Sequence, residues 1–190
     1  MRIITGSARG TRLATLAGDN TRPTAERVKE AVFSMLQSVR DAQVLDLFAG
    51  SGQLALEALS RGAAGAVLCD SSRAAVGVIR ANAEKTHLLE LCDVRCTDAV
   101  QLLNRLAEEK RSFDLVFLDP PYALGMLPQI LEQLFSRGLL KEGARIVCES
   151  ANEGDVFGNS TALREAFNVL RVARYGAAAV TVLSKKEGTA

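Results

Sequence analysis

The chain has 190 residues, which leaves little room for two full domains, and 48% of them are apolar and 24% charged, a composition that argues against long disordered stretches. We predict one domain over residues 1–190, with an N-terminal extension at 1–40 and the main core at 41–190. The sequence has no apolar run near the roughly 20 residues of a membrane span and no signal-peptide pattern, so we expect a cytoplasmic location. The four cysteines form no CxxC pair, which predicts buried free thiols and no metal site.

The formal net charge is only +1, but the two ends of the chain are basic. Six basic residues accompany three acidic ones over residues 1–30, and five accompany two over residues 164–190. Such ends can attract phosphate groups, while the acidic middle suits a small cationic ligand. A solvated surface with chance clustering explains the pattern equally well.

The first forty residues predict a small β-hairpin followed by a helix. Residues 2–5 and 11–14 are short apolar runs around a glycine-bounded turn. Thr24 can cap a helix in which Val28, Val32 and Leu36 recur at helical spacing.

From Val44 onward, short apolar runs alternate with helical stretches, which is the pattern of a parallel sheet with crossover helices. The predicted strands are residues 44–48, 65–70, 91–96, 113–119 and 144–149. The predicted helices are residues 53–61, 73–86, 99–109 and 127–137. Two apolar runs, 169–174 and 178–184, then predict a closing antiparallel hairpin. The fold class is therefore α/β, with a mostly parallel seven-stranded sheet and helices on both faces.

A glycine turn after the first predicted strand is the strongest signal for a ligand. Gly50 and Gly52 let the backbone bend sharply and approach a ligand, and the following helix offers free amide groups. Ala55 stands where the dinucleotide fingerprint has its third glycine, which favours a nucleoside ligand. Similar turns also occur in α/β proteins that bind nothing there.

Two acidic residues close the next two predicted strands. Asp70 lies twenty residues after Gly50, where a carboxylate can accept hydrogen bonds from both ribose hydroxyls. Asp98 can accept a hydrogen bond from an adenine amino group. Each can instead cap the helix that follows it.

The sequence Asp119-Pro120-Pro121-Tyr122 lies at the end of the fourth predicted strand and is the segment that we predict to act on the substrate. The two prolines stiffen the backbone and present carbonyl groups in fixed directions. Asp119 and the Pro120 carbonyl can accept the two hydrogens of an exocyclic amine and aim its nitrogen at a methyl donor. Tyr122 can stack on the base.

With these motifs in this order, the chain resembles the class I methyltransferases, which have a Rossmann-like fold. It is most similar to the bacterial RsmD-type 16S ribosomal RNA guanine-N2 methyltransferases, and the likeness is carried by residues 2–6, 22–24, 27–33, 56–63 and 113–122. The resemblance implies methyl transfer from S-adenosylmethionine to one guanine that is flipped out of its RNA helix, with S-adenosylhomocysteine as product.

The same resemblance implies roles for individual residues. The target base would meet Asp119, Pro120 and Tyr122. The donor would be bound by Arg22, Thr24, Asp46, Phe48, Ala49, Gly50, Gly52, Asp70, Asp98 and Asp119. We expect a monomer that acts on ribosomal RNA within small-subunit particles.

Two other functions stay open. An adenine-N6 methyltransferase for RNA or DNA can use the same DPPY sequence, and the residues alone do not distinguish guanine from adenine. A nucleotide-binding module without catalysis would need only the glycine turn, and the intact DPPY sequence argues against it.

Overall fold

The computed structural model describes residues 1–16, 23–36, 38–120, 125–151, 155–176 and 178–188. Within these ranges seven strands form one sheet in the order β3-β2-β1-β4-β5-β7-β6. The strands are β1 (Gln43–Asp46), β2 (Gly65–Asp70), β3 (Cys92–Cys96), β4 (Phe113–Leu118), β5 (Leu140–Ala151), β6 (Phe167–Tyr175) and β7 (Ala178–Lys185). Strands β1 to β5 pair in parallel, and β7 lies antiparallel between β5 and β6. This arrangement confirms the predicted sheet and its closing hairpin.

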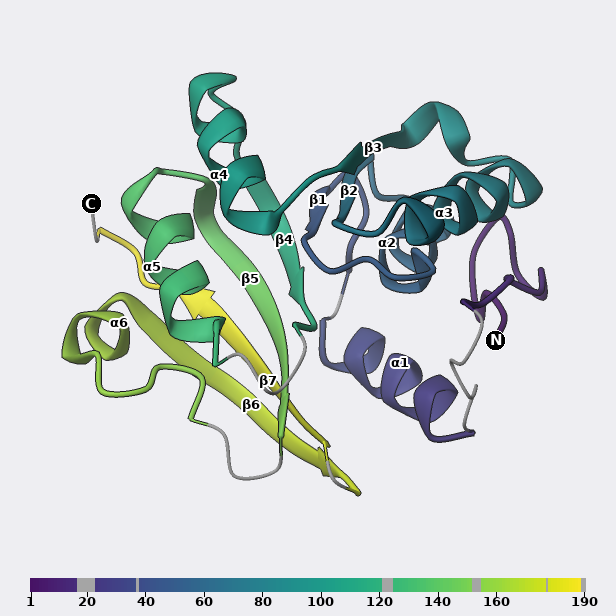
Figure 1. Cartoon of the computed structure of the whole chain (residues 1–190). Coiled ribbons are helices and arrows are strands. Elements are labelled where there is room, and N and C mark those ends of the chain that lie inside the picture. Colours follow the sequence, from purple (N-terminus) through teal and green to yellow (C-terminus); the bar gives the residue numbers. More distant parts are fainter. Residues whose placement is uncertain (17–22, 37, 121–124, 152–154, 177, 189–190) are drawn as a thin grey trace.

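Helices cover both faces of the sheet (Figure 1). The helices are α1 (Pro23–Met35), α2 (Gln53–Ser60), α3 (Arg73–Lys85), α4 (Ala99–Glu108), α5 (Leu127–Ser136) and α6 (Thr161–Ala166). Helices α1 to α3 lie on one side, and α4 to α6 lie on the other. Each crossover helix begins and ends within one residue of its predicted bounds.

The sheet therefore separates two apolar cores. Alternate residues of one strand point to opposite faces, so Val44 packs towards α1 to α3 and Leu45 towards α4 to α6. Leu68 and Val67 of β2 divide in the same way. Burial on both faces explains why these strands read as continuous apolar runs. No helix within the described residues is long and apolar enough to cross a membrane.

The predicted N-terminal hairpin forms only in part. Its two arms meet in one isolated bridge between Arg2 and Arg12, and no strand extends over residues 2–5 or 11–14. The amides of Ile4 and Thr5 donate instead to the buried carboxylate of Glu57 in α2, at 2.8 and 3.1 Å. A side chain from another element thus takes the donors that a longer hairpin would need.

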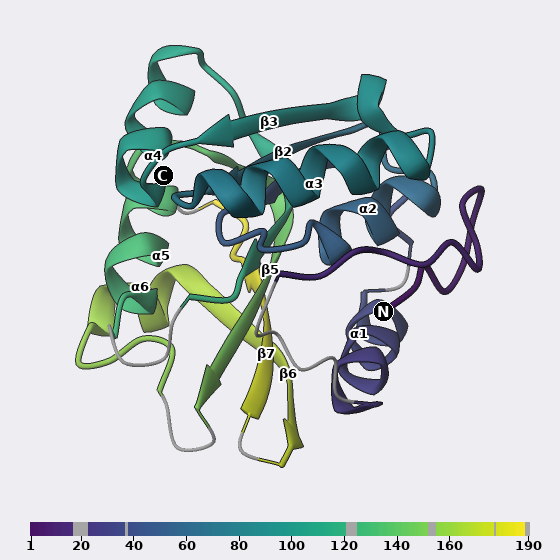
Figure 2. The ribbon, with the colours of Figure 1, turned by 45° about the vertical axis from the view of Figure 1, so that its right-hand side comes forward.

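The N-terminal segment, residues 1–16, runs along α2 and α3 and is held there by polar side chains (Figure 2). Ser60 Oγ accepts from the Ala8 amide at 3.0 Å and donates to the Thr5 carbonyl at 2.7 Å. The approach is so close that a Cβ on Gly6 would lie 1.7 Å from the Ser60 carbonyl oxygen. The segment is therefore fitted to α2 at a position that only glycine can occupy.

Strand β5 and helix α6 also differ from the prediction. Strand β5 begins at Leu140 instead of residue 144, because Leu140 pairs with Phe113 before the β4–β5 register shifts and pairing resumes at Leu115 and Arg145. Helix α6 was not predicted, since its six residues are too few to show a helical period. Ser160 caps it by accepting from the Leu163 amide.

Candidate active site

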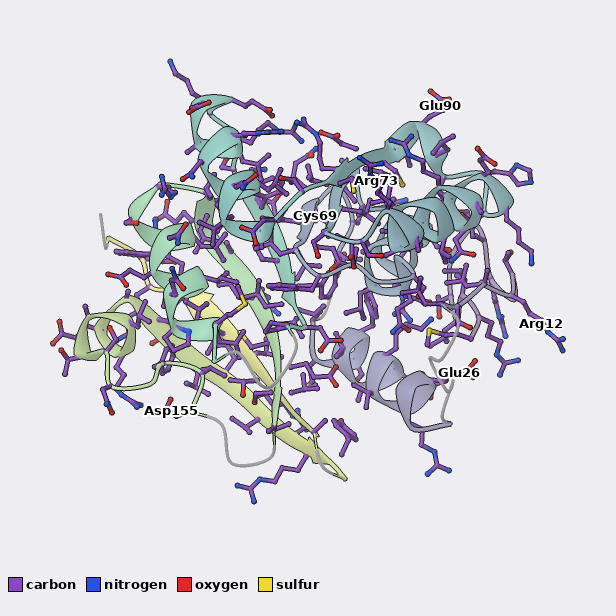
Figure 3. The ribbon with its side chains drawn as sticks, viewed as in Figure 1. Arg12, Glu26, Cys69, Arg73, Glu90 and Asp155 are labelled. Atoms are coloured by element: carbon purple, nitrogen blue, oxygen red, sulfur yellow. The ribbon has the colours of Figure 1, made fainter. Side chains whose placement is uncertain are left out.

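A cavity of about 570 Å³ lies at the carboxyl ends of β1 to β5. The order of the strands reverses between β1 and β4, which is where open α/β sheets bind their ligands. The lining residues lie at or just after the carboxyl ends of these five strands, except for one residue that caps α5. They are Leu47, Phe48, Asp70, Ser71, Thr97, Asp98, Ala99, Asp119, Pro120, Met126 and Glu149. In Figure 3 the labelled Cys69 and Arg73 flank Asp70 and Ser71 in the chain and so locate the β2 side of the cavity.

The glycine turn has the geometry that the sequence predicts. Gly50 and Gly52 have φ angles of +54° and +77°, a region that L side chains rarely adopt. A Cβ on Gly50 would meet no atom within 4 Å, whereas one on Gly52 would press on Leu68, Ile79 and Leu56 at 3.3 to 3.4 Å. Gly50 thus leaves open space, and Gly52 lets α2 pack closely on the sheet. The Ala49 amide joins the turn to β2 by donating to the Cys69 carbonyl at 2.9 Å.

Asp70 ties the glycine turn to the end of β2. Its Oδ2 accepts from the Gly50 amide at 3.0 Å, and its Oδ1 accepts from the Ser72 amide at 2.8 Å. A carboxylate has about four acceptor positions, so these two bonds leave capacity for ligand hydroxyls. Asp70 therefore fixes the local turn and still presents acceptor capacity to the cavity, where the sequence predicts a ribose.

Asp98 likewise caps a helix and lines the cavity. Its Oδ1 accepts from the amides of Val100 and Gln101, at 2.8 and 3.3 Å, so it caps α4 as the alternative interpretation expected. The residue also lines the cavity. Capping fixes the carboxylate at the β3 side of the site.

Asp46 lies beneath the glycine turn with only 2% of its surface exposed. Burial raises the pKa of its carboxyl to about 7, although the backbone N–H groups of Phe48 and Ala55 counteract this rise. Neighbouring Asp70 raises the pKa further. Asp46 therefore supports the turn from below, whereas Phe48 lines the cavity itself.

The end of β4 places Asp119 and Pro120 at the opposite wall from Asp70 and Asp98. Asp119 is exposed and Pro120 is buried, and both line the cavity. Pro121, Tyr122 and Arg22 lie outside the described residues, and Thr24 is described only as part of the α1 backbone. The described part of the DPPY sequence thus lines the same cavity as the acidic ends of β2 and β3.

The cavity also contains residues that sequence reasoning did not select. Ser71 and Ala99 directly follow Asp70 and Asp98, so their position next to a predicted site residue could have identified them from the sequence. Met126 enters from the start of α5, and nothing in its sequence context indicates a site. Glu149 is the last residue of the predicted fifth strand, and a strand-end carboxylate is found as often in solvent as in a site.

The arrangement can hold a small cationic ligand of nucleoside type. Four carboxylate residues, Asp70, Asp98, Asp119 and Glu149, surround apolar surface from Phe48 and Met126. The volume falls in the range of about 300 to 1,000 Å³ that is usual for ligand pockets. Sheet order, antiparallel β7 and this cavity together define the architecture of class I methyltransferases.

Comparison with known proteins gives the family. The family model described as Conserved hypothetical protein 95 matches residues 1–184. The putative rRNA methyltransferase YlbH of Bacillus subtilis is 38% identical over 80% of this chain and 84% of its own length. Ribosomal RNA small subunit methyltransferase D of Escherichia coli is 39% identical over 80% of this chain and 76% of its own length. A solved Escherichia coli structure, the putative methyltransferase yhhF, has a TM-score of 0.80 at 33% identity and covers 98% of both chains. The chain belongs to this family of RsmD type.

Proposed function

We propose that this protein transfers a methyl group from S-adenosylmethionine to the exocyclic N2 amine of a guanine in 16S ribosomal RNA. The observation that carries the proposal is the position of Asp119 and Pro120 beside an acid-lined cavity at the reversal point of the sheet. The names of relatives that are 38 and 39% identical support ribosomal RNA as the substrate class.

The residues of the cavity fit S-adenosylmethionine by charge and by position. Asp70 would accept hydrogen bonds from the ribose, Asp98 would accept one from the adenine amine, and the open space at Gly50 would admit the methionine portion. The bound donor supplies a methyl group on a positively charged sulfur, which leaves as a neutral thioether. The carboxylates around the cavity favour that positive charge.

Asp119 and Pro120 would act on the amine. Its lone pair is delocalised into the purine ring, and two acceptors that hold its hydrogens make it available for attack. The nitrogen lone pair forms the new N–C bond while the carbon–sulfur electrons stay with the sulfur. The nitrogen then carries a positive charge and releases one proton to Asp119 or to water, so no general base with a shifted pKa is required.

The test is a comparison of ribosomal RNA from a deletion strain and its parent by mass spectrometry of nucleosides. We expect one N2-methylguanosine of the small subunit to be lost in the deletion strain and restored by the purified protein with S-adenosylmethionine. Loss of an N6-methyladenosine instead would assign the adenine alternative. An unchanged nucleoside profile would reject ribosomal RNA methylation.

A further inference from the structure

A second cavity, of about 290 Å³, adjoins the cavity at the carboxyl ends of β1 to β5. The two cavities share Pro120, Met126 and Glu149, so a molecule in one borders a molecule in the other. The second cavity lies between the end of β5, the start of α5 and the loop before α6, where Figure 3 labels Asp155. It is therefore placed on the side of the sheet that α4 to α6 cover.

Ser150 gives this cavity a buried hydroxyl that none of the described residues satisfies. The residue is 6% exposed and lines the cavity, and its Oγ has no hydrogen-bond partner among the described residues. Cys148, two positions earlier in β5, belongs to the core under α4 to α6, so Ser150 points to the same side. A buried hydroxyl without a partner is unfavourable, and a ligand with a polar edge would supply the missing bond.

The two carboxylates that line the second cavity already have partners. Asp155 is paired with Arg164, and Glu149 takes part in an interaction of its own. Most of the other lining side chains are apolar: Pro120, Met126, Leu127, Pro128 and Ala151. An apolar cavity with one unsatisfied hydroxyl suits a flat ring with a polar edge, such as an RNA base taken out of its stack.

The sheet connects Ser150 to an exposed arginine on the edge strand β6. Ser150 pairs with Ala179 of β7, and Ala179 pairs with Arg174 of β6. Paired residues point to the same side and neighbouring strands are about 4.8 Å apart, so Arg174 stands about 10 Å from Ser150 on the side of α4 to α6. Arg174 is exposed. A base and the phosphates next to it in an RNA strand are separated by a comparable distance.

Exposed apolar side chains accompany Arg174 on this side of the sheet. Val169 and Val172 are 51% and 55% exposed, and they pair with Leu183 and Thr181 of β7. Leu183 belongs to the core under α4 to α6, and Thr181 lies two positions from it, so both valines point to that side. The β6–β7 hairpin extends past α5 and α6 here (Figures 1 and 2). Clustered apolar residues on an open sheet edge indicate a surface that meets a partner.

A bulge turns the other arginine of β6 to the opposite side. The pairing of β6 with β7 shifts between Val169 and Arg171, so Arg171 pairs with Val182, which belongs to the core under α1 to α3. Arg171 is also exposed. The strand thus carries one arginine on each side, and Arg174 is the one that shares a side with the second cavity.

We propose that the substrate RNA strand lies across the α4–α6 side of β5, β7 and β6, with the target base in the second cavity against Ser150 and an adjoining phosphate on Arg174. Residues 164–190 carry five basic and two acidic residues, a balance that favours a polyanion as the occupant. This inference rests on the proposed function, because the base must reach the methyl donor past Pro120, which both cavities share. It adds the path of the RNA and two residues that position it.

The first measurement is binding of small-subunit particles from a deletion strain at several salt concentrations. Loss of one phosphate contact lowers the slope of log Kd against log salt concentration by about 0.7 to 0.9, and Arg174→Gln should show a change of this size. Arg171→Gln is the matched control on the opposite side of the same strand, and it should keep the wild-type slope. A wild-type slope in Arg174→Gln, or an equal change in both variants, would overturn the inference.

The second measurement concerns Ser150→Ala, which removes the unsatisfied hydroxyl. Thermal unfolding of this variant should occur at the wild-type temperature or above, because no described contact is lost. Methylation of the same particles should nevertheless fall by about 5-fold or more in kcat/KM, since the base loses its hydrogen bond. Affinity for S-adenosylmethionine should stay within a few-fold. An unchanged kcat/KM or a lower unfolding temperature would contradict the position given to the base.

A photocrosslinking amino acid in place of Val172 distinguishes RNA from protein as the occupant of this surface. We expect it to attach to 16S ribosomal RNA beside the methylated nucleotide. Attachment to a protein of the particle would overturn the inference. No methylation of the particles by the wild-type protein would instead reject the proposed function itself.

Discussion

Three aspartates at the strand ends have different surroundings and therefore suit different tasks. Asp119 is exposed to the cavity, Asp70 accepts from two backbone amides, and Asp46 is buried under the glycine turn. A carboxylate that meets substrate needs access, whereas one that supports a loop needs fixed partners. The chemistry of the site is thus divided among residues of one type by their environment.

Replacing Asp119 should separate chemistry from donor binding. Asp119→Ala removes an acceptor that acts on the target amine, so we expect single-turnover methylation at saturating donor to fall by about 100-fold or more. Affinity for S-adenosylmethionine should stay within a few-fold. Asp119→Asn should be milder, since its amide oxygen still accepts a hydrogen bond. A wild-type rate in Asp119→Ala would reduce the DPPY sequence to a structural turn.

Asp46 should make stability depend on pH. Its pKa rises from 3.8 in the unfolded chain to about 7 in the folded protein, so between these values the folded state holds a proton that the unfolded state has lost. Stability should therefore fall as pH rises from about 4 to about 7, by up to roughly 4 kcal/mol, and then stay level. Asp46→Asn lacks this titration. Urea unfolding at several pH values gives the free energy of unfolding of the wild-type protein and of Asp46→Asn, and the difference between the two should change between pH 4 and 7. A constant difference would mean that Asp46 ionises normally.

At the scale of elements, the N-terminal segment and the glycine turn are joined through α3. Asn82 is 1% exposed, and its Oδ1 accepts from the Ala14 amide at 2.8 Å. Its Nδ2 donates to the carbonyls of Ala14 and Ser51, at 3.0 and 2.9 Å. Ser51 stands between the two glycines of the turn, so one buried amide group holds both segments.

Removing the two N–H groups that Asn82 donates should therefore weaken binding of S-adenosylmethionine. Asn82→Asp sets an acceptor against two carbonyls, and we expect the Kd for S-adenosylmethionine to rise about 10-fold or more. Ser60→Ala is the control, because Ser60 holds the same N-terminal segment but does not contact the turn. Calorimetry on both variants distinguishes the effects: equal changes in Kd would mean that the N-terminal segment, and not the turn, is responsible.

The sequence predicted elements whose signals are local and missed those that depend on distant partners. The glycine turn and the acidic strand ends each lie within a few consecutive residues. The hairpin at residues 2–14 was overestimated because Glu57, more than fifty residues away, captures its amides. Cys96 was expected to be buried but is exposed, because β3 is an edge strand and lacks a neighbour on one side.

At the scale of the whole molecule, the charge distribution bears on how RNA is recognised. Strand β6 at the other edge of the sheet exposes Val169, Leu170 and Val172 together with Arg171 and Arg174. A net charge of only +1 supports few phosphate contacts, so specificity would have to come from the shape of the substrate.

We therefore expect small-subunit particles to be methylated at least about 10-fold faster than a short naked oligonucleotide that contains the same target. The measurement is kcat/KM for each substrate at several salt concentrations. Few phosphate contacts also predict a shallow dependence of binding on salt. Equal rates on both substrates would show that the protein needs only the local sequence.

The position of β7 has a consequence for synthesis of the protein in the cell. Of the seven described strands it is translated last, yet it lies between β5 and β6 and pairs with both. Until it emerges from the ribosome, β5 has an open edge and β6 has no neighbour in the sheet. Open edges invite pairing with other chains. A premature stop codon before residue 178 should therefore yield aggregates. Every described residue that lines the cavity at the carboxyl ends of β1 to β5 would nevertheless already be present.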